Sequence, residues 1–356
     1  MPATQKTFKG YAVTDAEKWT DFSVVEFPSK NWEETDVEIS TTHCGVCGSD
    51  VHTVSSGWGP IPTPMIVGHE IVGTVVRVGS KVKSGIKVGD RVGVGAQAGS
   101  CYECKCCKSG FENYCLKPVY TYNSVYPDGV RSQGGYSTGI IANEQFVFPI
   151  PDSVASADAA SMLCGGLTVY SPLLHHGAGP GKKVGVLGIG GLGHYAILFA
   201  KAMGCEVYAF SHSASKKEDA KKMGADHFIE TADPKFHQNY AQELDLIIST
   251  RNVADEFPLT EFLSMLNPFG KFILVGVPET PLPAIHAFSL IQGGRFLGGS
   301  AIGSKLDAIS MFKLVAEKNI KPWIEVLPMK EVKKAVDGVW TGKPRYRYVL
   351  EQDITA

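Results

Sequence analysis

The sequence predicts an α/β protein with two domains, a small β-barrel followed by a doubly wound parallel sheet. Its 356 residues are more than one hydrophobic core usually serves. Between residues 71 and 95, apolar and polar residues alternate and glycines recur, which is typical of a β-barrel. From residue 183 to 299, short apolar runs alternate with helix-like segments, which indicates a parallel sheet.

The composition is that of an ordinary globular protein, with 44% hydrophobic and 20% charged residues. The 34 basic residues nearly balance the 36 acidic ones, so the charge of −2 indicates neither a nucleic-acid nor a membrane partner. The first residues lack the apolar stretch of a signal peptide, and no apolar run approaches a membrane span of roughly 18 residues. We therefore expect a cytoplasmic protein.

Residues 43–52 contain two histidines, two cysteines and an aspartate. A buried thiol pair beside a polar loop explains this cluster equally well, since free cysteine is commonly a small core residue. His69 next to Glu70 is likewise more often a polar pair than a metal site. Together, however, Cys47, His69 and Cys164 supply the two sulfurs and one imidazole that hold a catalytic zinc with an open position.

Five of the nine cysteines fall between residues 101 and 115. Four thiolates at their spacing can close a tetrahedral structural zinc site. An iron–sulfur cluster also takes four thiolates, and a nucleic-acid-binding zinc knuckle would need more basic and aromatic neighbours than this segment has. Cys106 has no assigned role, and the four predicted ligands are Cys101, Cys104, Cys107 and Cys115.

Residues 120–150 are rich in glycine, serine and tyrosine, which suits turns and surface loops. Residues 153–170 then have the pattern of a helix that includes Cys164. The strongest pattern follows, with a buried strand at 183–187, a glycine turn and a helix that ends at Gly204. Strand, Gly-x-Gly-x-x-Gly and helix in this order predict a dinucleotide-binding site, although a glycine-rich turn that serves only packing can have the same sequence pattern.

In such a turn the first glycine permits the bend, the second lets the backbone approach a pyrophosphate, and the third lets helix and strand pack closely. The helix N-terminus offers N–H groups to the phosphates. The residues predicted to contact the cofactor here are Gly188, Gly190, Gly191, Leu192 and Gly193.

Further strands are expected at 206–210, 226–229, 244–249, 271–275 and 295–299, with helices at 215–223 and 259–266. An NAD-binding fold usually has an acidic residue after the second strand, to bind the ribose 2′-hydroxyl. Here no carboxylate occurs until Glu218, whereas hydroxyls and two lysines are present. This charge pattern favours NADP, although Lys216 and Lys217 could also be an exposed first helical turn.

Residues 304–356 have a helix around 306–318 and then short strand-like pieces. This segment is too short for a separate domain, so we expect it to return to the N-terminal unit. It ends with the run RYRYVL at residues 345–350.

Taken together, the motifs GVCGSDVH, GHEIVG, VGDRVGVGAQ, CGGLTVY, GIGGLGH, KKMGADHFIE and RYRYVL occur in a characteristic order. With the four-cysteine segment, they make the chain resemble the zinc-dependent medium-chain alcohol dehydrogenases along its whole length. The closer resemblance is to the cinnamyl alcohol dehydrogenase branch, which includes broad-specificity NADPH-dependent enzymes of fungi.

The resemblance implies a GroES-like catalytic domain at residues 1–155, a Rossmann NADP-binding domain at 156–303, and a C-terminal return at 304–356. It implies one catalytic and one structural zinc per subunit. It also implies a homodimer that pairs through the edge strand near residues 295–303.

The resemblance assigns Cys47, His69 and Cys164 as catalytic zinc ligands, with Glu70 beside the metal. It further implies that Asp50 orients the ligand histidine, and that Ser49 and His52 relay a proton. Expected cofactor contacts are Thr168, Ser211, His212, Lys216, Val275, Gly276, Ser300 and Arg347. Trp58, Tyr120 and Ile302 fall in regions that line the substrate pocket of relatives, although ordinary core packing explains such residues equally well.

The implied reaction is reversible, NADPH-dependent reduction of aromatic or medium-chain aliphatic aldehydes to primary alcohols, with zinc as Lewis acid. A second reading is a reductase of the same scaffold that acts on a polyol or on an imine of specialised metabolism. A third is a catalytically silent cofactor- or zinc-binding protein, which the completeness of the predicted site disfavours.

Overall fold

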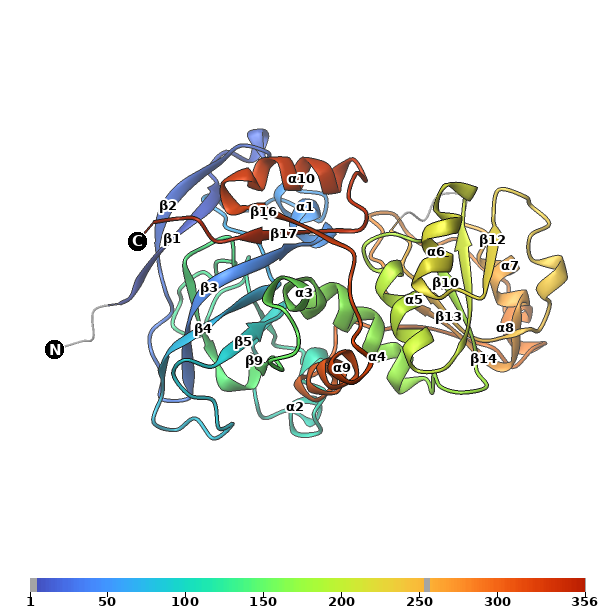
Figure 1. Cartoon of the computed structure of the whole chain (residues 1–356), viewed down its shortest axis with the longest axis horizontal. Coiled ribbons are helices and arrows are strands. Elements are labelled where there is room, and N and C mark those ends of the chain that lie inside the picture. Colours follow the sequence, from blue (N-terminus) through green and yellow to red (C-terminus); the bar gives the residue numbers. More distant parts are fainter. Residues whose placement is uncertain (1–4, 253–256, 356) are drawn as a thin grey trace. The chain divides into compact units, whose positions relative to one another are not determined.

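The computed structural model describes residues 5–252 and 257–355. The chain divides into two compact units, each with its own sheet (Figure 1). The first unit comprises residues 1–167 and 303–356, and the second comprises residues 168–302. Residues 156–167, which the resemblance assigns to the Rossmann domain, fall in the first unit in this division.

The main sheet of the first unit has the order β16-β17-β3-β4-β5-β9, and β8 also pairs with β3. Its strand pairs are antiparallel except β16 with β17, which is parallel. Its strands are β3 (Asp36–Val46), β4 (Ile71–Val78), β5 (Arg91–Val94), β8 (Gly139–Asn143), β9 (Val147–Pro149), β16 (Ile324–Pro328) and β17 (Arg347–Glu351).

β3 is the central strand of this unit, and most of its residues are buried. The C-terminal β17 pairs antiparallel with β3, so the end of the chain completes the sheet that the N-terminal segment begins. Helix α10 (Val332–Trp340) packs against β16, β17 and β3, because Val332, Ala335 and Val336 lie on one helical face and are buried (Figure 1). Helix α3 (Ser156–Ser161) contacts β3, β4 and β17.

The smaller elements of the first unit surround this sheet. Two two-stranded ribbons pair β1 (Thr7–Val13) with β2 (Phe22–Pro28) and β6 (Gln97–Gly99) with β7 (Val119–Tyr120). The helices are α1 (Gly48–Val54), α2 (Lys105–Lys108) and α9 (Lys305–Lys318). Short 3-10 turns occur at Ala16–Lys18, Glu112–Tyr114, Glu144–Phe146 and Met329–Glu331.

The second unit is a parallel sheet in the order β12-β11-β10-β13-β14-β15. Two halves run outward from adjacent central strands, which is the doubly wound order of dinucleotide-binding folds. The predicted α/β fold is therefore confirmed. The strands are β10 (Lys183–Leu187), β11 (Glu206–Ser211), β12 (His227–Glu230), β13 (Leu244–Ser249), β14 (Leu266–Leu274) and β15 (Phe296–Gly299).

Helix α5 (Gly193–Ala202) follows β10 and lies in front of the sheet in Figure 1, together with α6 (Lys217–Met223). Ala196, Ile197 and Ala200 bury one face of α5, and Gly204 ends this segment with a φ of 90°. The other helices are α7 (Leu259–Ser264), which contacts β14, and α8 (Phe288–Ile291). 3-10 turns occur at Ala214–Lys216 and Gln238–Tyr240.

Three local features differ from the sequence-based expectation. The segment expected to be turns and loops, 120–150, contains β8 and β9. Strand β14 begins at Leu266, five residues before the predicted start, and its register with β13 shifts between Leu266 and Lys271. The predicted helix at 153–170 is α3, then a π-helical turn at Met162–Gly166, then α4 (Leu167–His175).

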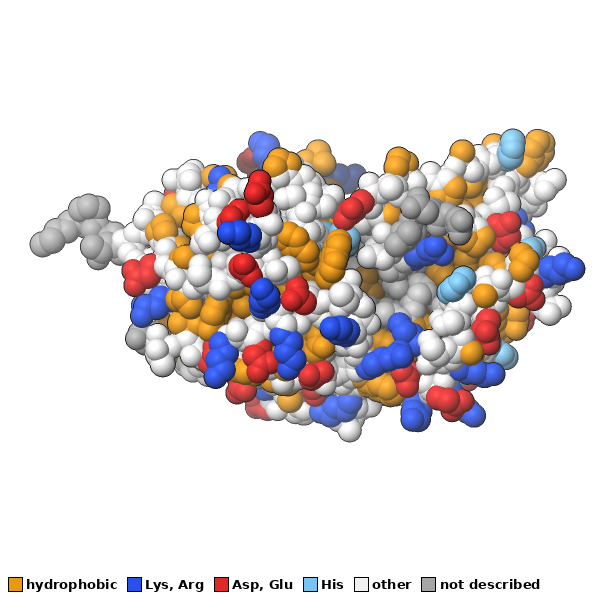
Figure 2. Space-filling model, turned by 90° about the horizontal axis from the view of Figure 1, so that it is seen from above, with side chains coloured by type: hydrophobic (Ala, Val, Ile, Leu, Met, Phe, Trp, Pro, Cys, Tyr) orange, Lys and Arg blue, Asp and Glu red, His pale blue; other side chains and the backbone are white. Residues whose placement is uncertain are grey.

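Within the described ranges, no helix is both long and apolar enough to cross a membrane. On the face shown in Figure 2, acidic and basic side chains are interspersed rather than gathered into a patch of one sign. This distribution agrees with the nearly balanced composition.

Candidate active site

Four side chains with metal-binding atoms converge inside the first unit. The ligand atoms of Cys47, His69, Glu70 and Cys164 all lie within 4.8 Å of one another, and all four residues are buried. Cys47 immediately precedes α1, and His69 and Glu70 immediately precede β4. Cys164 is contributed by the π-helical turn, and such turns recur at functional sites because they widen a helix locally.

The atoms of this cluster fit a zinc ion. The sulfurs of Cys47 and Cys164 lie 3.9 Å apart. The adjacent Cys164 holds the pKa of Cys47 well below its ordinary value, and that of Cys164 is raised in turn. One of the two sulfurs is therefore stable as a thiolate, whereas the other needs a bound cation in order to lose its proton. The Nε2 atom of His69 is buried without a hydrogen-bond partner among the described residues, as expected of a metal-binding nitrogen.

The other ring nitrogen of His69 has two neighbours. Its Nδ1 lies 3.3 Å from Oδ1 of Asp50 and 3.1 Å from the hydroxyl of Tyr122. Burial lowers the pKa of His69. The charge of Asp50 and the interactions of His69 with Cys47 outweigh burial and raise this pKa to about 9. The same negative surroundings favour a bound dication. Asp50 is a predicted residue, whereas Tyr122 was missed, because no spacing links it to His69 in the sequence.

Glu70 is held by a buried ion pair. Nη2 of Arg347 donates to both carboxylate oxygens of Glu70, and the Gly165 N–H donates to Oε1 at 2.9 Å. Burial raises the pKa of Glu70 to about 7, against the opposing charge of Arg347. A Cβ on Gly45 would lie 1.9 Å from Oε2, so this glycine leaves the space that the carboxylate fills. Arg347, expected near the cofactor pyrophosphate, thus contacts Glu70 in this structure.

The two predicted proton-relay residues lie on α1, one turn apart. The Ser49 hydroxyl lies 3.7 Å from the Cys47 sulfur, beside the metal-ligand cluster. The ring of His52 stacks on the indole of Trp58, with centroids 5.0 Å apart and an interplanar angle of 15°. The structure thus places Ser49 beside the ligand cluster and one predicted pocket residue beside His52.

The second cluster lies in the segment between β6 and β7. The sulfurs of its four cysteines lie within 4.8 Å of one another, and Cys106 is outside the group. The pKa of Cys101 is lowered to about 6 by backbone N–H groups that bond its sulfur, including that of Cys104 at 3.4 Å. Four sulfurs with N–H donors around them fit a closed tetrahedral metal site. The ligands are Cys101, Cys104, Cys107 and Cys115.

The glycine turn of the second unit has the geometry of a phosphate-binding turn. Gly188 adopts a φ of 87°, which favours glycine. A Cβ on Gly193 would lie 1.8 Å from the Gly188 carbonyl oxygen, so the start of α5 packs directly on the turn. A Cβ on Gly190 would meet nothing within 4 Å, so space remains over the backbone where a pyrophosphate would approach.

The two predicted 2′-phosphate contacts, Ser211 and Lys216, and the predicted cofactor contact His212 lie at or just beyond the end of β11, the strand next to β10. Ser211 is its last residue, His212 is exposed, and the ammonium of Lys216 reaches back to the Ile189 carbonyl at 2.6 Å. The structure thus brings Lys216 beside the glycine turn. Ser213 and Ser215, whose hydroxyls are 3.0 Å apart, were not singled out in the sequence.

The remaining predicted cofactor residues are placed as follows. Thr168 is buried near the start of α4, in the second unit. Val275 and Gly276 directly follow β14, and Ser300 directly follows β15. All four are thus assigned to the unit that contains the glycine turn, three of them at the carboxyl ends of parallel strands, where nucleotides bind in such folds.

Comparisons with known proteins agree with these two sites. The model of the alcohol dehydrogenase GroES-like domain matches residues 33–152, and that of the zinc-binding dehydrogenase domain matches residues 191–317. The NADP-dependent alcohol dehydrogenase 6 of Saccharomyces cerevisiae is 42% identical over 96% of both chains. The chain belongs to the zinc-dependent medium-chain alcohol dehydrogenase family.

Two further relatives of this dehydrogenase extend the comparison. A probable mannitol dehydrogenase of Mesembryanthemum crystallinum is 42% identical over 98% of this chain and 95% of the relative. The structure of a cinnamyl alcohol dehydrogenase from Sorghum bicolor is 36% identical, with a TM-score of 0.93 over 99% of this chain and 100% of that one. The dehydrogenase is therefore an oxidoreductase, and its family favours zinc over an iron–sulfur cluster at the four cysteines.

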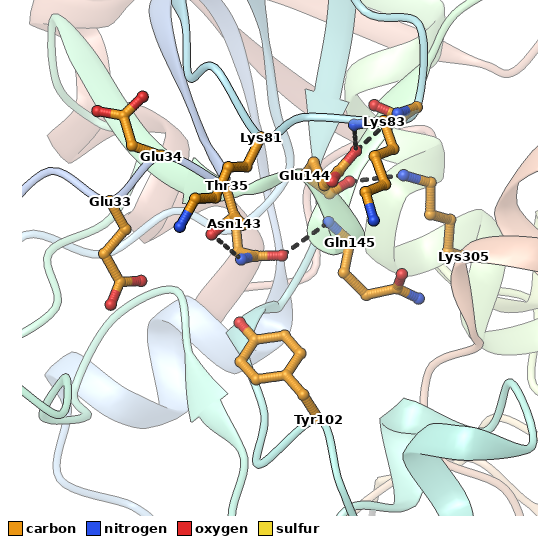
Figure 3. A pocket seen from close by; sticks show the side chains of 11 residues that line it. Glu33, Glu34, Thr35, Lys81, Lys83, Tyr102, Asn143, Glu144, Gln145 and Lys305 are labelled. Carbon is orange, nitrogen blue, oxygen red and sulfur yellow. Dashed lines mark hydrogen bonds between the residues drawn. The ribbon is translucent and has the colours of Figure 1, made fainter.

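A cavity of about 950 Å³ lies elsewhere in the first unit of the dehydrogenase (Figure 3). None of the predicted site residues lines it. Its polar groups largely bond one another: Glu144 accepts from the Lys83 and Ser84 N–H groups, and Asn143 accepts from the Gln145 N–H. We assign this cavity no part in the reaction.

The three predicted substrate-pocket residues have different surroundings. Trp58 is 45% exposed and stacks on His52. Tyr120 ends β7 and is 49% exposed. Ile302 has a φ of 54°, which a β-branched residue rarely adopts and which recurs at functional sites.

Proposed function

We propose that this dehydrogenase reduces aldehydes, aromatic or medium-chain aliphatic, to primary alcohols in a reversible, NADP(H)-dependent reaction. The observation that carries the proposal is the buried cluster of Cys47, His69 and Cys164, in which the Nε2 of His69 makes no hydrogen bond to any described residue. Two sulfurs and one nitrogen leave a fourth position for substrate, as catalytic zinc sites do. The Ser49 hydroxyl beside this cluster supplies the proton-transfer group that the reaction requires.

When bound, zinc supplies Lewis acidity toward the substrate oxygen, and NADPH supplies the hydride. Cys47, His69 and Cys164 hold the metal. Ser49 holds the proton at the reacting oxygen, and His52, one turn along α1, passes it on to solvent. Asp50 keeps His69 oriented.

The preference for NADP rests on charge. No carboxylate follows β11 until Glu218, and Ser211 and Lys216 supply a hydroxyl and an ammonium there. The ammonium of Lys216 already lies against the glycine turn. A 2′-phosphate would meet these donors without an opposing carboxylate.

Initial rates of NADPH and NADH oxidation with cinnamaldehyde test the proposal, measured before and after exhaustive zinc chelation. We expect rapid use of NADPH, slower use of NADH, and loss of both on chelation that added zinc restores. Activity with NADH alone would refute the roles of Ser211 and Lys216. Activity that survives complete removal of zinc would refute the metal site.

A polyol is the second candidate substrate, favoured by the likeness to a probable mannitol dehydrogenase. Polyol enzymes of this scaffold usually prefer NAD and have an acidic residue after the second strand, which this chain lacks. Oxidation of mannitol with NAD that exceeds reduction of cinnamaldehyde with NADPH would favour this candidate.

We also propose that the dehydrogenase is a homodimer that pairs through β15. Among the described residues, β15 is the last strand of its sheet, and Phe296 is 54% exposed. Phe288 and Ile291 of α8 expose 67% and 71% of their surface. An open edge with exposed apolar side chains is suited to pairing with a second copy.

Analytical ultracentrifugation of wild type and Phe296→Lys tests this assembly. We expect a dimer for the wild type and a monomer for the variant, with Leu116→Lys as a control at a site that is 96% exposed in the first unit. A monomeric wild type would refute the dimer.

For the compartment we propose the cytoplasm. None of the nine cysteines, all of which the structure describes, forms a disulfide, and eight of them belong to the first unit. Metal-binding thiolates persist in a reducing compartment. Cell fractionation with the tagged chain tests this assignment, and recovery in a secreted fraction would refute it.

A further inference from the structure

Two buried tyrosines lie behind the metal ligand His69 and have no role in the site so far. The Tyr136 hydroxyl lies 3.0 Å from Oδ2 of Asp50. The Tyr122 hydroxyl lies 3.1 Å from Nδ1 of His69. Tyr136 is fully buried and Tyr122 is 7% exposed, so both hydroxyls have left water for these partners.

Asp50 depends on all the donors around it, because its carboxylate is completely buried. Oδ1 accepts from the Gly68 N–H at 3.1 Å and faces His69 Nδ1 at 3.3 Å. Oδ2 accepts from the Cys47 N–H at 2.9 Å and from Tyr136. The carboxylate thus joins the two chain segments that carry Cys47 and His69, and the hydroxyls of Tyr136 and Tyr122 both bond to it.

The Tyr136 ring is fixed where it can reach Asp50. The backbone N–H of Tyr136 donates to the Val67 carbonyl at 3.1 Å, and the Tyr136 carbonyl accepts from the Tyr11 N–H at 2.8 Å. A Cβ on Gly68 would lie 2.5 Å from Cδ1 of the ring, so the ring packs directly on the backbone next to His69. This packing places the Tyr136 hydroxyl against Asp50.

Tyr122 restrains the imidazole itself. Its ring stacks on His69 with centroids 5.4 Å apart and an interplanar angle of 25°. The backbone before it is anchored, since the Thr121 N–H donates to the Ala96 carbonyl at 3.0 Å. The imidazole is thus held on its face by a ring and at Nδ1 by Asp50 and a hydroxyl.

We propose that the hydroxyls of Tyr136 and Tyr122 are positioning groups for the zinc ligand His69. Tyr136 acts through Asp50, and Tyr122 acts directly on Nδ1. This inference rests on the proposed assignment of Cys47, His69 and Cys164 as ligands. Loss of either hydroxyl leaves the ligands in place but frees the imidazole to turn, and partners of this kind typically change metal affinity about 10–100-fold.

The test uses the zinc-loaded protein and the variants Tyr136→Phe and Tyr122→Phe, which keep the ring and hence the packing. Tyr126→Phe is the matched control, because this buried tyrosine of the same unit makes no hydroxyl hydrogen bond among the described residues. Competition with a chromogenic chelator measures zinc affinity at both sites. The four-cysteine site in the same molecule is the internal reference.

We expect Tyr136→Phe and Tyr122→Phe to bind zinc roughly tenfold more weakly at the site that contains His69. The four-cysteine site and the Tyr126→Phe control are expected to match the wild type. Substitution of the site that contains His69 with cobalt(II) gives a second readout, since its visible bands report ligand geometry. The bands are expected to shift in both variants, which a merely structural role would not cause.

Wild-type zinc affinity and cobalt spectra in both variants would overturn the inference. A wild type that binds zinc only at the four cysteines would instead overturn the ligand assignment beneath it. The two failures are distinguishable, because the first leaves two zinc ions per chain in every protein and the second leaves one in every protein.

Discussion

Gly45 lies opposite the Glu70 carboxylate, and the space between them admits no larger side chain. Single residues restrict the geometry of this site most tightly, since Glu70 and Arg347 are both buried and depend on each other. A buried ion pair contributes little net stability when intact, but the loss of one partner leaves an uncompensated charge. Small changes around Glu70 are therefore expected to have large effects.

Gly45→Ala is expected to displace Glu70, because the new Cβ would lie 1.9 Å from Oε2. Separation from Arg347 should lower the free energy of unfolding by roughly 3 kcal/mol, measured by urea denaturation. Gly48→Ala is the matched control, since its Cβ would meet nothing within 4 Å. Equal stability of the two variants would show that the ion pair does not depend on this space.

The residues that sequence reasoning could find are those whose type is itself informative. Cysteine and histidine are candidate metal ligands by type alone, and the structure brings Cys47, His69 and Cys164 together although they lie far apart in the sequence. Tyr122 and Tyr136 could not be found in this way, because single tyrosines in a turn-rich segment form no pattern. Their importance follows from contacts with residues 53 and 86 positions away.

At the scale of elements, the strand–turn–helix of the second unit combines two demands on its glycines. Gly193 must be small because α5 packs on the turn, whereas the space at Gly190 is open. The same three-glycine pattern therefore contains one position needed for folding and one available to a ligand. Alanine substitutions at Gly193 and at Gly190 test the folding role and the ligand-binding role separately.

Gly193→Ala is expected to destabilise the protein by about 1–3 kcal/mol, because its Cβ would overlap the Gly188 carbonyl. Gly190→Ala is expected to keep the wild-type melting temperature but to raise the Kd for NADP roughly tenfold or more, since one hydrogen bond to a charged phosphate is worth about 1.5–3 kcal/mol. Calorimetry measures both quantities. Unchanged NADP binding by Gly190→Ala would contradict the predicted phosphate contact.

The sequence predicted the strands of the parallel sheet well, because strands buried on both faces are continuous apolar runs. β10 and β13 match the predicted ranges. The start of β14 was missed, because Asn267, Pro268 and Gly270 have the composition of a turn. β8 and β9 were missed because each is short, and their pairing with distant strands decides their conformation.

At the scale of the whole molecule, the two metal clusters have different consequences for stability. The four-cysteine segment is linked to the return of the chain, since Glu112 accepts from the Lys305 N–H at 2.7 Å, at the start of α9. A metal that binds only the folded state adds its binding energy to folding. The cluster of Cys47, His69 and Cys164, in contrast, has a sheet-based core around it.

Cys104→Ser is expected to lower the thermal midpoint markedly and to leave one zinc per chain. Metal analysis and differential scanning calorimetry measure these two quantities, and Cys106→Ser is the matched control, since Cys106 lies outside the cluster. Iron in the purified wild type would favour the iron–sulfur alternative. A Cys104→Ser protein as stable as the control would contradict a structural role.

The central claim is that Cys47, His69 and Cys164 form a zinc site on which the reductase depends. The most direct test measures zinc per chain and NADPH-linked reduction of cinnamaldehyde for Cys164→Ser beside the wild type. The account predicts a fall from two zinc ions to one, loss of activity, and a melting temperature close to that of the wild type. Two zinc ions and wild-type activity in Cys164→Ser would contradict it.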